Sequence, residues 1–242
     1  MRGVSPFDSC ITIVECIITH LYRRPKKHLI STNEEPDEQQ YGLSRLLDFC
    51  DGVFGFAITL LIITIPFSLR GLPPSATNAQ TVQQLRLLLP SLYAYVLSFF
   101  IVGNYWVNHH RIFRQFIKYD SLLLWINLTL LLFIVFLPVP TSFLGLYGEN
   151  SVIAALYATT QMVIVLIYLI MNWYASSHHR LIAPSVDQKT ITYGYLRSLI
   201  AVTMFALSIG IAFLNPDLAK FWWLAIFIVQ PLVLRGYTRL AL

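Results

Sequence analysis

Charged residues are scarce in this chain. Asp, Glu, Lys and Arg make up 12% of the 242 residues, roughly half the share that is usual in soluble globular proteins. Apolar residues make up 56%, and the mean hydropathy is +0.63. A soluble domain cannot bury repeated apolar runs of about 20 residues each. The composition therefore excludes a soluble enzyme, a disordered chain and a small disulfide scaffold, and it indicates an integral membrane protein with several spans.

Cysteine is also rare, and its spacing supports no metal site or disulfide framework. The three cysteines are Cys10, Cys16 and Cys50. They form no Cys-x-x-Cys pair and have no zinc-ligand spacing, and the chain has no His-Glu-x-x-His motif. The adjacent histidines His109-His110 and His178-His179 would point about 100° apart on a helix, so such a pair rarely chelates one ion alone. We expect no metal site, no bound cofactor and no enzyme activity.

Six apolar runs are long enough to cross a membrane as helices, which takes about 20 residues. They are Phe49–Leu69, Leu85–Trp106, Ser121–Val139, Val152–Asn172, Thr192–Leu214 and Leu218–Leu234. The first run is broken at Pro66, the third ends at Pro138 to Pro140, and the fifth ends just before Pro216, which are turn signals. We predict an all-α integral membrane protein with six transmembrane helices per subunit, formed by residues 44–242.

The basic residues are distributed unevenly around these spans. Of the 17 Lys and Arg residues, three lie on one side of the predicted membrane, at Arg70, Arg86 and Lys220, and the other fourteen share the side that holds the N-terminus. Lys and Arg accumulate on the cytoplasmic side of membrane proteins, so we predict cytoplasmic termini and a plasma or inner membrane location. Because these residues are scattered over short loops, we expect no binding to nucleic acid.

Residues 1–43 precede the first span and are predicted to form a cytoplasmic extension. Within it, Cys10–Tyr22 is apolar but too short to cross a membrane, and it carries Glu15 and His20. This segment is either a helix on the membrane surface, with Arg23, Arg24, Lys26 and Lys27 against anionic headgroups, or part of an unstructured extension.

Polar residues at one end of the first two spans form the first candidate site. They are Arg45 and Asp51 in the first span and Trp106, Asn108, His109 and His110 in the second. A carboxylate at the edge of an apolar helix is costly unless it is paired, so we expect a hydrogen-bonded network between the two helices. The network is either a structural clamp or, since histidine titrates near neutral pH, part of a gating or pH-sensing device.

One face of the first span is the second candidate site. It carries Phe56, Thr59, Leu60 and Ile63, at positions i, i+3, i+4 and i+7 of a helix. Repeated around a four-fold axis, this face would form stacked apolar rings with one ring of hydroxyl groups, and hydrophobic constrictions can gate a pore by dewetting. A face that packs against another helix would show the same periodicity, so the spacing alone leaves both possibilities open.

Several residues of the first span follow one longer pattern. They are Arg45, Phe49, Asp51, Gly52, Val53, Phe54, Ala57, Thr59, Leu60 and Leu61. This pattern resembles the first helix of the endosomal and lysosomal potassium channels called transmembrane protein 175, and of their shorter prokaryotic relatives. Cys50, Gly55 and Phe56 stand where that family usually has serine, alanine, and isoleucine or leucine. Trp106 to His110 and Asn127 to Thr141 resemble the ends of its second and third helices.

The resemblance implies a potassium-preferring cation channel that conducts passively. A single repeat of six helices implies a homotetramer in which the four first helices line the pore. Phe56, Leu60 and Ile63 would then form the pore constriction, and Thr59 would contribute to ion selectivity. The partners implied are potassium and other monovalent cations, the lipid membrane and three further copies of the chain.

Two other membrane functions remain as alternatives, a secondary transporter and a proton-conducting protein. A transporter would be expected to contain inverted repeats with interrupted helices, and we find no convincing similarity between residues 44–140 and 150–242. An intramembrane enzyme would need a nucleophile or a metal constellation, and the sequence contains no pattern typical of either.

Overall fold

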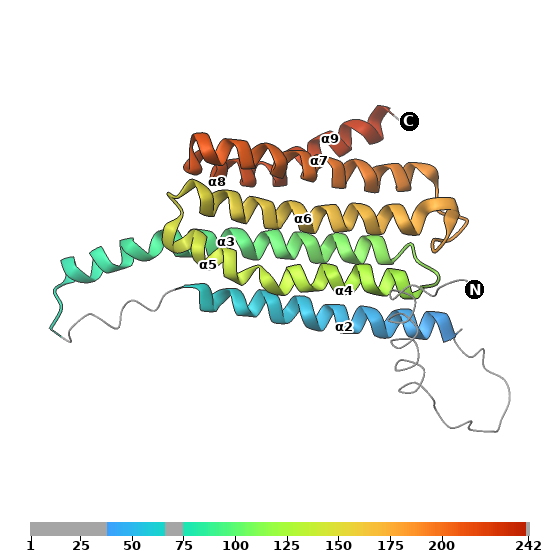
Figure 1. Cartoon of the computed structure of the whole chain (residues 1–242), viewed down its shortest axis with the longest axis horizontal. Helices are drawn as coiled ribbons and strands as arrows, with labels where there is room; N and C mark the ends of the chain where they lie inside the picture. The colour runs from blue at the N-terminus through green and yellow to red at the C-terminus, as the bar shows by residue number, and fades with distance from the viewer. Residues whose placement is uncertain (1–37, 66–74, 241–242) are drawn as a thin grey trace, which may run out of the picture. The chain divides into compact units, whose positions relative to one another are not determined.

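The structure, a computed structural model, describes residues 38–65 and 75–240, and the regular elements in these ranges are all helical (Figure 1). They are α2 (Glu38–Leu60), η1 (Leu61–Thr64), α3 (Asn78–Phe113), α4 (Ser121–Phe136), α5 (Pro138–Tyr147), α6 (Ser151–Ser176), η3 (Ser177–His179), α7 (Gln188–Leu214), α8 (Pro216–Leu224) and α9 (Ile226–Leu240). Apart from Glu38, these residues belong to one unit, Gln39–Leu242. The prediction of an all-α protein is confirmed for the described residues. The predicted surface segment Cys10–Tyr22 lies outside them.

Five helical stretches in the described ranges are long and apolar enough to cross a membrane. They are Glu38–Thr64, Asn78–Phe113, Ser121–Tyr147, Ser151–Ser176 and Gln188–Leu214. The sixth predicted span, Leu218–Leu234, is not one straight helix, because α8 and α9 meet at Ala225 with a bend of 43°. At the break, the amide of Ala225 bonds to the carbonyl groups of Trp222 and Trp223, which is the tighter winding of a helix end. The bent pair passes the same test of length and composition when it is counted as one span.

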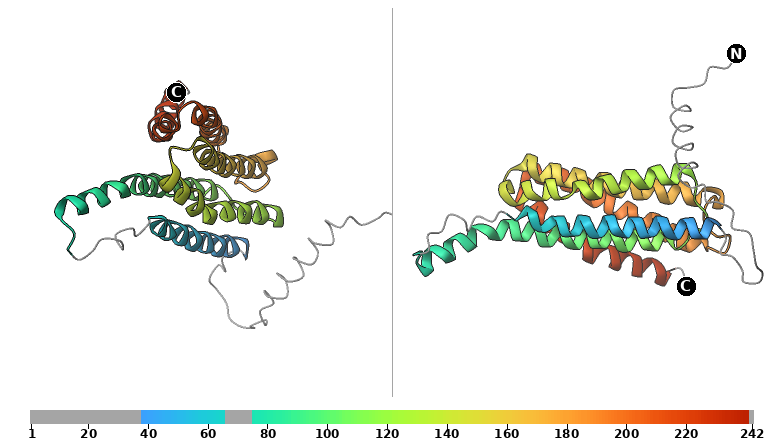
Figure 2. Two further views of the ribbon diagram at one scale, coloured as in Figure 1. Left: turned by 60° about the vertical axis from the view of Figure 1, so that its left-hand side comes forward. Right: turned by 90° about the horizontal axis from the view of Figure 1, so that it is seen from below.

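Helix α3 is much longer than the predicted span Leu85–Trp106. A capping box starts it, in which the Thr77 amide donates to Gln80 Oε1 at 2.9 Å and the Gln80 amide donates to Thr77 Oγ1 at 3.4 Å. Its 36 residues extend over about 54 Å, well beyond a hydrocarbon core of about 30 Å. The first turns of α3 accordingly project past the ends of the other helices (Figures 1 and 2). Hydropathy missed these turns because they are polar.

Proline has a different effect in the third span from the one predicted. The span was expected to end within Pro138 to Pro140, but Pro138 is the first residue of α5, which continues to Tyr147. Proline is well tolerated at this position because the first amides of a helix have no intrahelical acceptor. Helices α4 and α5 together therefore form one candidate span of 27 residues.

The first span also departs from the prediction, since its α-helix ends nine residues before the expected end at Leu69. Four β-branched residues precede Pro66, and such residues are poor α-helix formers. Proline forces the residue before it out of the helical region, and Ile65 is accordingly extended, with a ψ of 115°. Ile63 therefore lies on the 3₁₀ turn η1, and the i+7 relation to Phe56 that an α-helix would give does not hold.

Helix α6 forms the centre of the bundle, and α2 lies along its edge (Figure 1). The side chains of Tyr157, Gln161 and Tyr168 on α6 are buried against neighbouring helices. On α2, by contrast, burial is confined to one side. The first span is thus attached to the bundle by one face and leaves the other face open.

Candidate functional site

The open face of α2 contains the residues predicted to line a pore. Phe56 is 59% exposed and Ile63 is 68% exposed, whereas Leu60 is half-buried. A Cβ atom added at Gly52 or Gly55 would meet no other atom within 4 Å. The space beside the two glycines is therefore free within the described part of the subunit, and more than half of the Phe56 surface is exposed.

The opposite face of α2 attaches the helix to the bundle. Cys50, Phe54, Ala57 and Leu61 are almost completely buried. Since these residues recur at intervals of three or four, they lie on one side of the helix. The large apolar residues of the first span therefore have two environments, one inside the subunit and one outside it.

Thr59 is the hydroxyl-bearing residue of the open face, and its hydrogen-bond donor is already used. Its Oγ1 donates to the Phe56 carbonyl at 2.8 Å, a bond that threonine commonly forms in helices. A hydroxyl group also carries two acceptor lone pairs. The bond to Phe56 therefore fixes the rotamer of Thr59 without removing its ability to offer oxygen to a cation.

The predicted polar network is divided into two clusters in the structure, and the first of them centres on Asp51. Trp106 Nε1 donates to Asp51 Oδ1 at 2.9 Å, and His110 Nδ1 lies 3.7 Å from the same oxygen. The rings of Trp106 and His110 pack with their centroids 4.5 Å apart. This cluster links the middle of α2 to the last turns of α3 on the partly exposed side of both helices.

The second cluster is buried and centres on Asn127 of α4. Asn127 Oδ1 lies 2.9 Å from His109 Nε2, and Asn127 Nδ2 donates to Cys50 Sγ at 3.1 Å. His109 is fully buried and stacks on Phe113, with 4.2 Å between the ring centroids. One amide side chain thus joins α2, α3 and α4.

One of the predicted network residues, Asn108, lies elsewhere. Asn108 lines a small cavity of about 20 Å³ on another side of α3, together with Asn104, Arg197 and Gln230. Arg197 Nη2 donates to Asn104 Oδ1 at 2.8 Å in this region. Arg45 is exposed on α2, six residues before Asp51.

Sequence reasoning did not identify the partners that Asn127 brings together. Asn127 was part of the family-like stretch, but it was assigned no role. Cys50 was considered as a metal ligand or disulfide partner and as a departure from the family pattern, but not as a hydrogen-bond partner. An asparagine within an otherwise apolar helix was the available signal, because such a group must find a partner in a membrane. Its actual partners are 18 and 77 residues away in the sequence. A local sequence pattern cannot indicate which residues at such separations come together in the fold.

A further group of buried hydroxyl and amide side chains joins α3, α5 and α6. Ser98 Oγ lies 2.9 Å from both Thr141 Oγ1 and Tyr157 Oη. One turn after Tyr157 on α6, Gln161 Oε1 accepts a hydrogen bond from Tyr105 Oη at 2.8 Å. These bonds satisfy polar groups inside the subunit, where each unpaired group would be costly.

In the described residues, no group of three His, Cys, Asp or Glu side chains could hold a metal ion.

Comparison with known proteins gives consistent results. Residues 45–138 match the family model described as "Endosomal/lysosomal potassium channel TMEM175". A potassium channel of Streptomyces collinus is 32% identical over 178 residues, which cover 72% of this chain and 84% of that protein. The human endosomal/lysosomal proton channel TMEM175 is 25% identical over 66% of this chain and 31% of its own length. The crystal structure of a lysosomal potassium-selective channel TMEM175 homologue from Chamaesiphon minutus superposes with a TM-score of 0.67 at 24% identity, covering 80% of this chain and 98% of that one.

Proposed function

Because the chain belongs to the TMEM175 family of ion channels, we propose that it is a potassium-preferring cation channel that conducts passively across a cell membrane. The Streptomyces collinus relative is named a potassium channel. The observation that carries the proposal is the open face of α2, where Phe56 and Thr59 are exposed beside two glycines with free space around them. A pore along a symmetry axis needs such a face, free in the subunit and covered only on assembly.

The proposed channel is a homotetramer whose four α2 helices surround the pore. Each subunit contributes six spans, with the bent pair α8 and α9 as the sixth, and residues 44–242 form this channel domain. Both termini are placed in the cytoplasm, with residues 1–43 as a cytoplasmic extension. Seven of the Lys and Arg side chains lie at the bundle end where α2 begins and α3 ends: Arg45, Arg111, Arg114, Lys118, Arg180, Lys189 and Arg197. This asymmetry supports the orientation.

The proposed constriction is a ring of Phe56 side chains, followed by rings of Leu60 and Ile63. A narrow apolar ring excludes water, so it limits conduction unless the pore widens. Thr59 lies between Phe56 and Leu60 in the sequence, and its lone pairs offer a cation one oxygen ligand per subunit. Potassium sheds its hydration shell more readily when protein oxygens replace it, which supports the assignment of Thr59 to ion selectivity.

The two polar clusters support the pore helix from behind. Asp51 is bound by Trp106 and lies close to His110, while Cys50 and His109 share Asn127. These bonds connect α2 to α3 and α4, so they help to fix its rotation and thereby the direction in which Phe56 points. We assign the clusters a positioning role.

A proton channel is the second candidate, because the human relative carries that name. Flux measurements in liposomes separate the possibilities. The proposal expects a tetramer after the detergent mass is subtracted, with passive potassium flux faster than sodium flux. Proton flux that persists without permeant metal cations would favour the second candidate, whereas saturable flux coupled to another ion would indicate a secondary transporter. A monomer that conducts would contradict the proposed architecture.

A further inference from the structure

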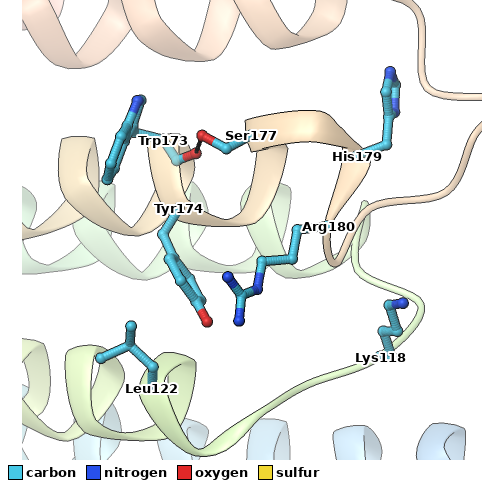
Figure 3. Close-up of a pocket in the computed structure, with 7 residues that line it drawn as sticks. All are labelled: Lys118, Leu122, Trp173, Tyr174, Ser177, His179 and Arg180. Atoms are coloured by element: carbon cyan, nitrogen blue, oxygen red, sulfur yellow. Dashed lines mark hydrogen bonds between the residues drawn. The ribbon is translucent and has the colours of Figure 1, made fainter.

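A cleft that is lined by no residue of α2 lies at the bundle end where α6 finishes and α4 begins (Figure 3). Its volume is about 820 Å³, and its lining includes Lys118, Leu122, Trp173, Tyr174, His179 and Arg180. These residues come from the connection before α4, the first turn of α4, the last turn of α6 and the segment after it. Neither the proposed pore nor the two polar clusters uses any of them.

One carboxylate organises the cleft. Asp120 caps α4, with its Oδ1 accepting from the Leu123 amide at 2.9 Å. Its Oδ2 accepts a hydrogen bond from the Tyr174 hydroxyl and lies 3.4 Å from Arg180 Nε. The Arg180 guanidinium also lies over the ring of Tyr174, 4.7 Å from its centroid. Both oxygens of Asp120 are therefore occupied by contacts within the subunit.

The same contacts leave the cleft with unused positive charge. Arginine carries five N–H donors, so Arg180 has further donors on its terminal nitrogens besides the Nε that lies against Asp120. Lys118 is exposed on the connection that precedes α4, and it adds a second permanent positive charge. Figure 3 shows Arg180 extended toward Tyr174 with Lys118 across the cleft from α6. The cleft is thus lined by two permanent cations, and the one carboxylate beside it is already engaged, which favours an anionic ligand.

The other side of the cleft is apolar and exposed. Trp173 is 60% exposed in the last turn of α6, and Leu122 is 51% exposed in the first turn of α4. Both residues lie at the ends of candidate spans, the level at which tryptophan meets lipid headgroups. A free anion would contact only the basic side, whereas a phospholipid would contact both sides.

We propose that this cleft binds an anionic phospholipid, with the phosphate between Arg180 and Lys118 and an acyl chain along Trp173 and Leu122. Basic pockets between membrane helices are suited to such headgroups. Tyr174 and Asp120 would hold the guanidinium in place before the lipid arrives, so that less side-chain freedom is lost on binding. The inference concerns the lipid surface of the bundle and does not depend on which ion the pore conducts.

The test is lipid binding by the purified full-length protein, measured by native mass spectrometry with phosphatidylglycerol and phosphatidylcholine added separately. The wild type should bind phosphatidylglycerol more tightly. Each basic residue near a membrane surface contributes a factor of about five to anionic lipid binding. Lys118→Gln, which breaks no hydrogen bond or ion pair identified in the structure, should therefore lower the preference about fivefold, and Lys118→Gln with Arg180→Gln should lower it at least tenfold.

Matched variants separate a built site from general surface charge and from misfolding. Arg114→Gln removes an exposed positive charge at the same bundle end but outside the cleft, and it should change the preference less than twofold. Arg180→Lys keeps the positive charge that Arg180→Gln removes, so this variant should retain most of the wild-type preference for phosphatidylglycerol. Competing inorganic phosphate should not displace the lipid. The proposal is overturned if Lys118→Gln has no effect, if Arg114→Gln has an equal effect, or if inorganic phosphate displaces the lipid completely.

Discussion

Two exposed helix faces in this protein have different compositions. The exposed face of α4 carries large apolar side chains, namely Trp125, Leu128, Leu132, Val135 and Phe136. The open face of α2 carries Gly52 and Gly55, and these small residues lie between the exposed side chains of Phe49 and Phe56. A face that meets acyl chains gains nothing from glycine, whereas small residues allow helices to approach closely within a membrane. The difference supports the proposed arrangement, in which α4 faces lipid and α2 faces other copies of itself.

The largest effect on assembly and conduction is expected from a bulky side chain that fills the free space beside the open face of α2. A Cβ atom added at Gly55 meets no other atom within 4 Å, so we expect the subunit of the Gly55→Phe variant to fold. In the tetramer, four added rings would collide near the axis, and we expect loss of the tetramer or of all measurable current. Size-exclusion chromatography with light scattering, together with liposome flux, would show this.

Gly210→Phe on α7 is the matched control for this change, because a Cβ atom at Gly210 also meets nothing within 4 Å. If α7 faces lipid, this variant should remain a conducting tetramer. Equal behaviour of the two glycine variants would mean that the free space beside α2 has no special role.

The next effect concerns the attachment of α2 rather than its open face. Asn127→Leu leaves His109 and Cys50 without their shared partner in a buried position, and an unpaired buried polar group costs about 1–3 kcal/mol. We expect a clearly lowered melting temperature and an altered pore, since Asn127 joins α2 to the bundle. The melting temperature in detergent, measured by tryptophan fluorescence, checks this prediction.

Cys50→Ser is the conservative counterpart of that change. The serine hydroxyl can accept from Asn127 Nδ2 as the thiol does, and serine is the residue that the family usually has there. We expect stability close to that of the parent chain. A large loss from Cys50→Ser would show that the fit of the sulfur atom, and not the hydrogen bond, maintains this contact.

A smaller effect is expected from widening the proposed constriction. Phe56→Ala should let water enter the ring and raise potassium conductance several-fold, because a narrow apolar ring limits conduction by dewetting. Phe136→Ala removes the same side chain from the exposed face of α4 and should leave the conductance unchanged. Single-channel recording of both variants would distinguish a pore-lining phenylalanine from one that faces lipid.

The spans could be predicted from the sequence because they depend on local runs of apolar residues. The spacing of Phe56, Thr59 and Leu60 predicted one face of α2, but the spacing alone left open whether that face is exposed or packs against another helix. The division of the polar network could have been predicted only in part. Adjacent residues point about 100° apart on a helix, so His109 and His110 could not both face Asp51, and the structure indeed places His109 against Asn127. The identity of that partner, like the length of α3, depends on contacts and capping that hydropathy does not measure.

The smallest effect, and the sharpest comparison of the two faces, comes from their threonines. Thr59 on α2 and Thr129 on α4 are both exposed, and each donates its hydroxyl proton to a carbonyl of its own helix at 2.8 Å. Thr59→Val and Thr129→Val therefore remove the same bond and the same oxygen, and they should change stability by similarly small amounts. Only the Thr59 oxygen faces the proposed pore. We expect Thr59→Val to lower the potassium-to-sodium permeability ratio about twofold or more, since fewer oxygens would replace the hydration shell of the ion, while Thr129→Val leaves it unchanged. Reversal potentials under bi-ionic conditions measure this ratio, and equal ratios in the two variants would remove Thr59 from the selectivity site.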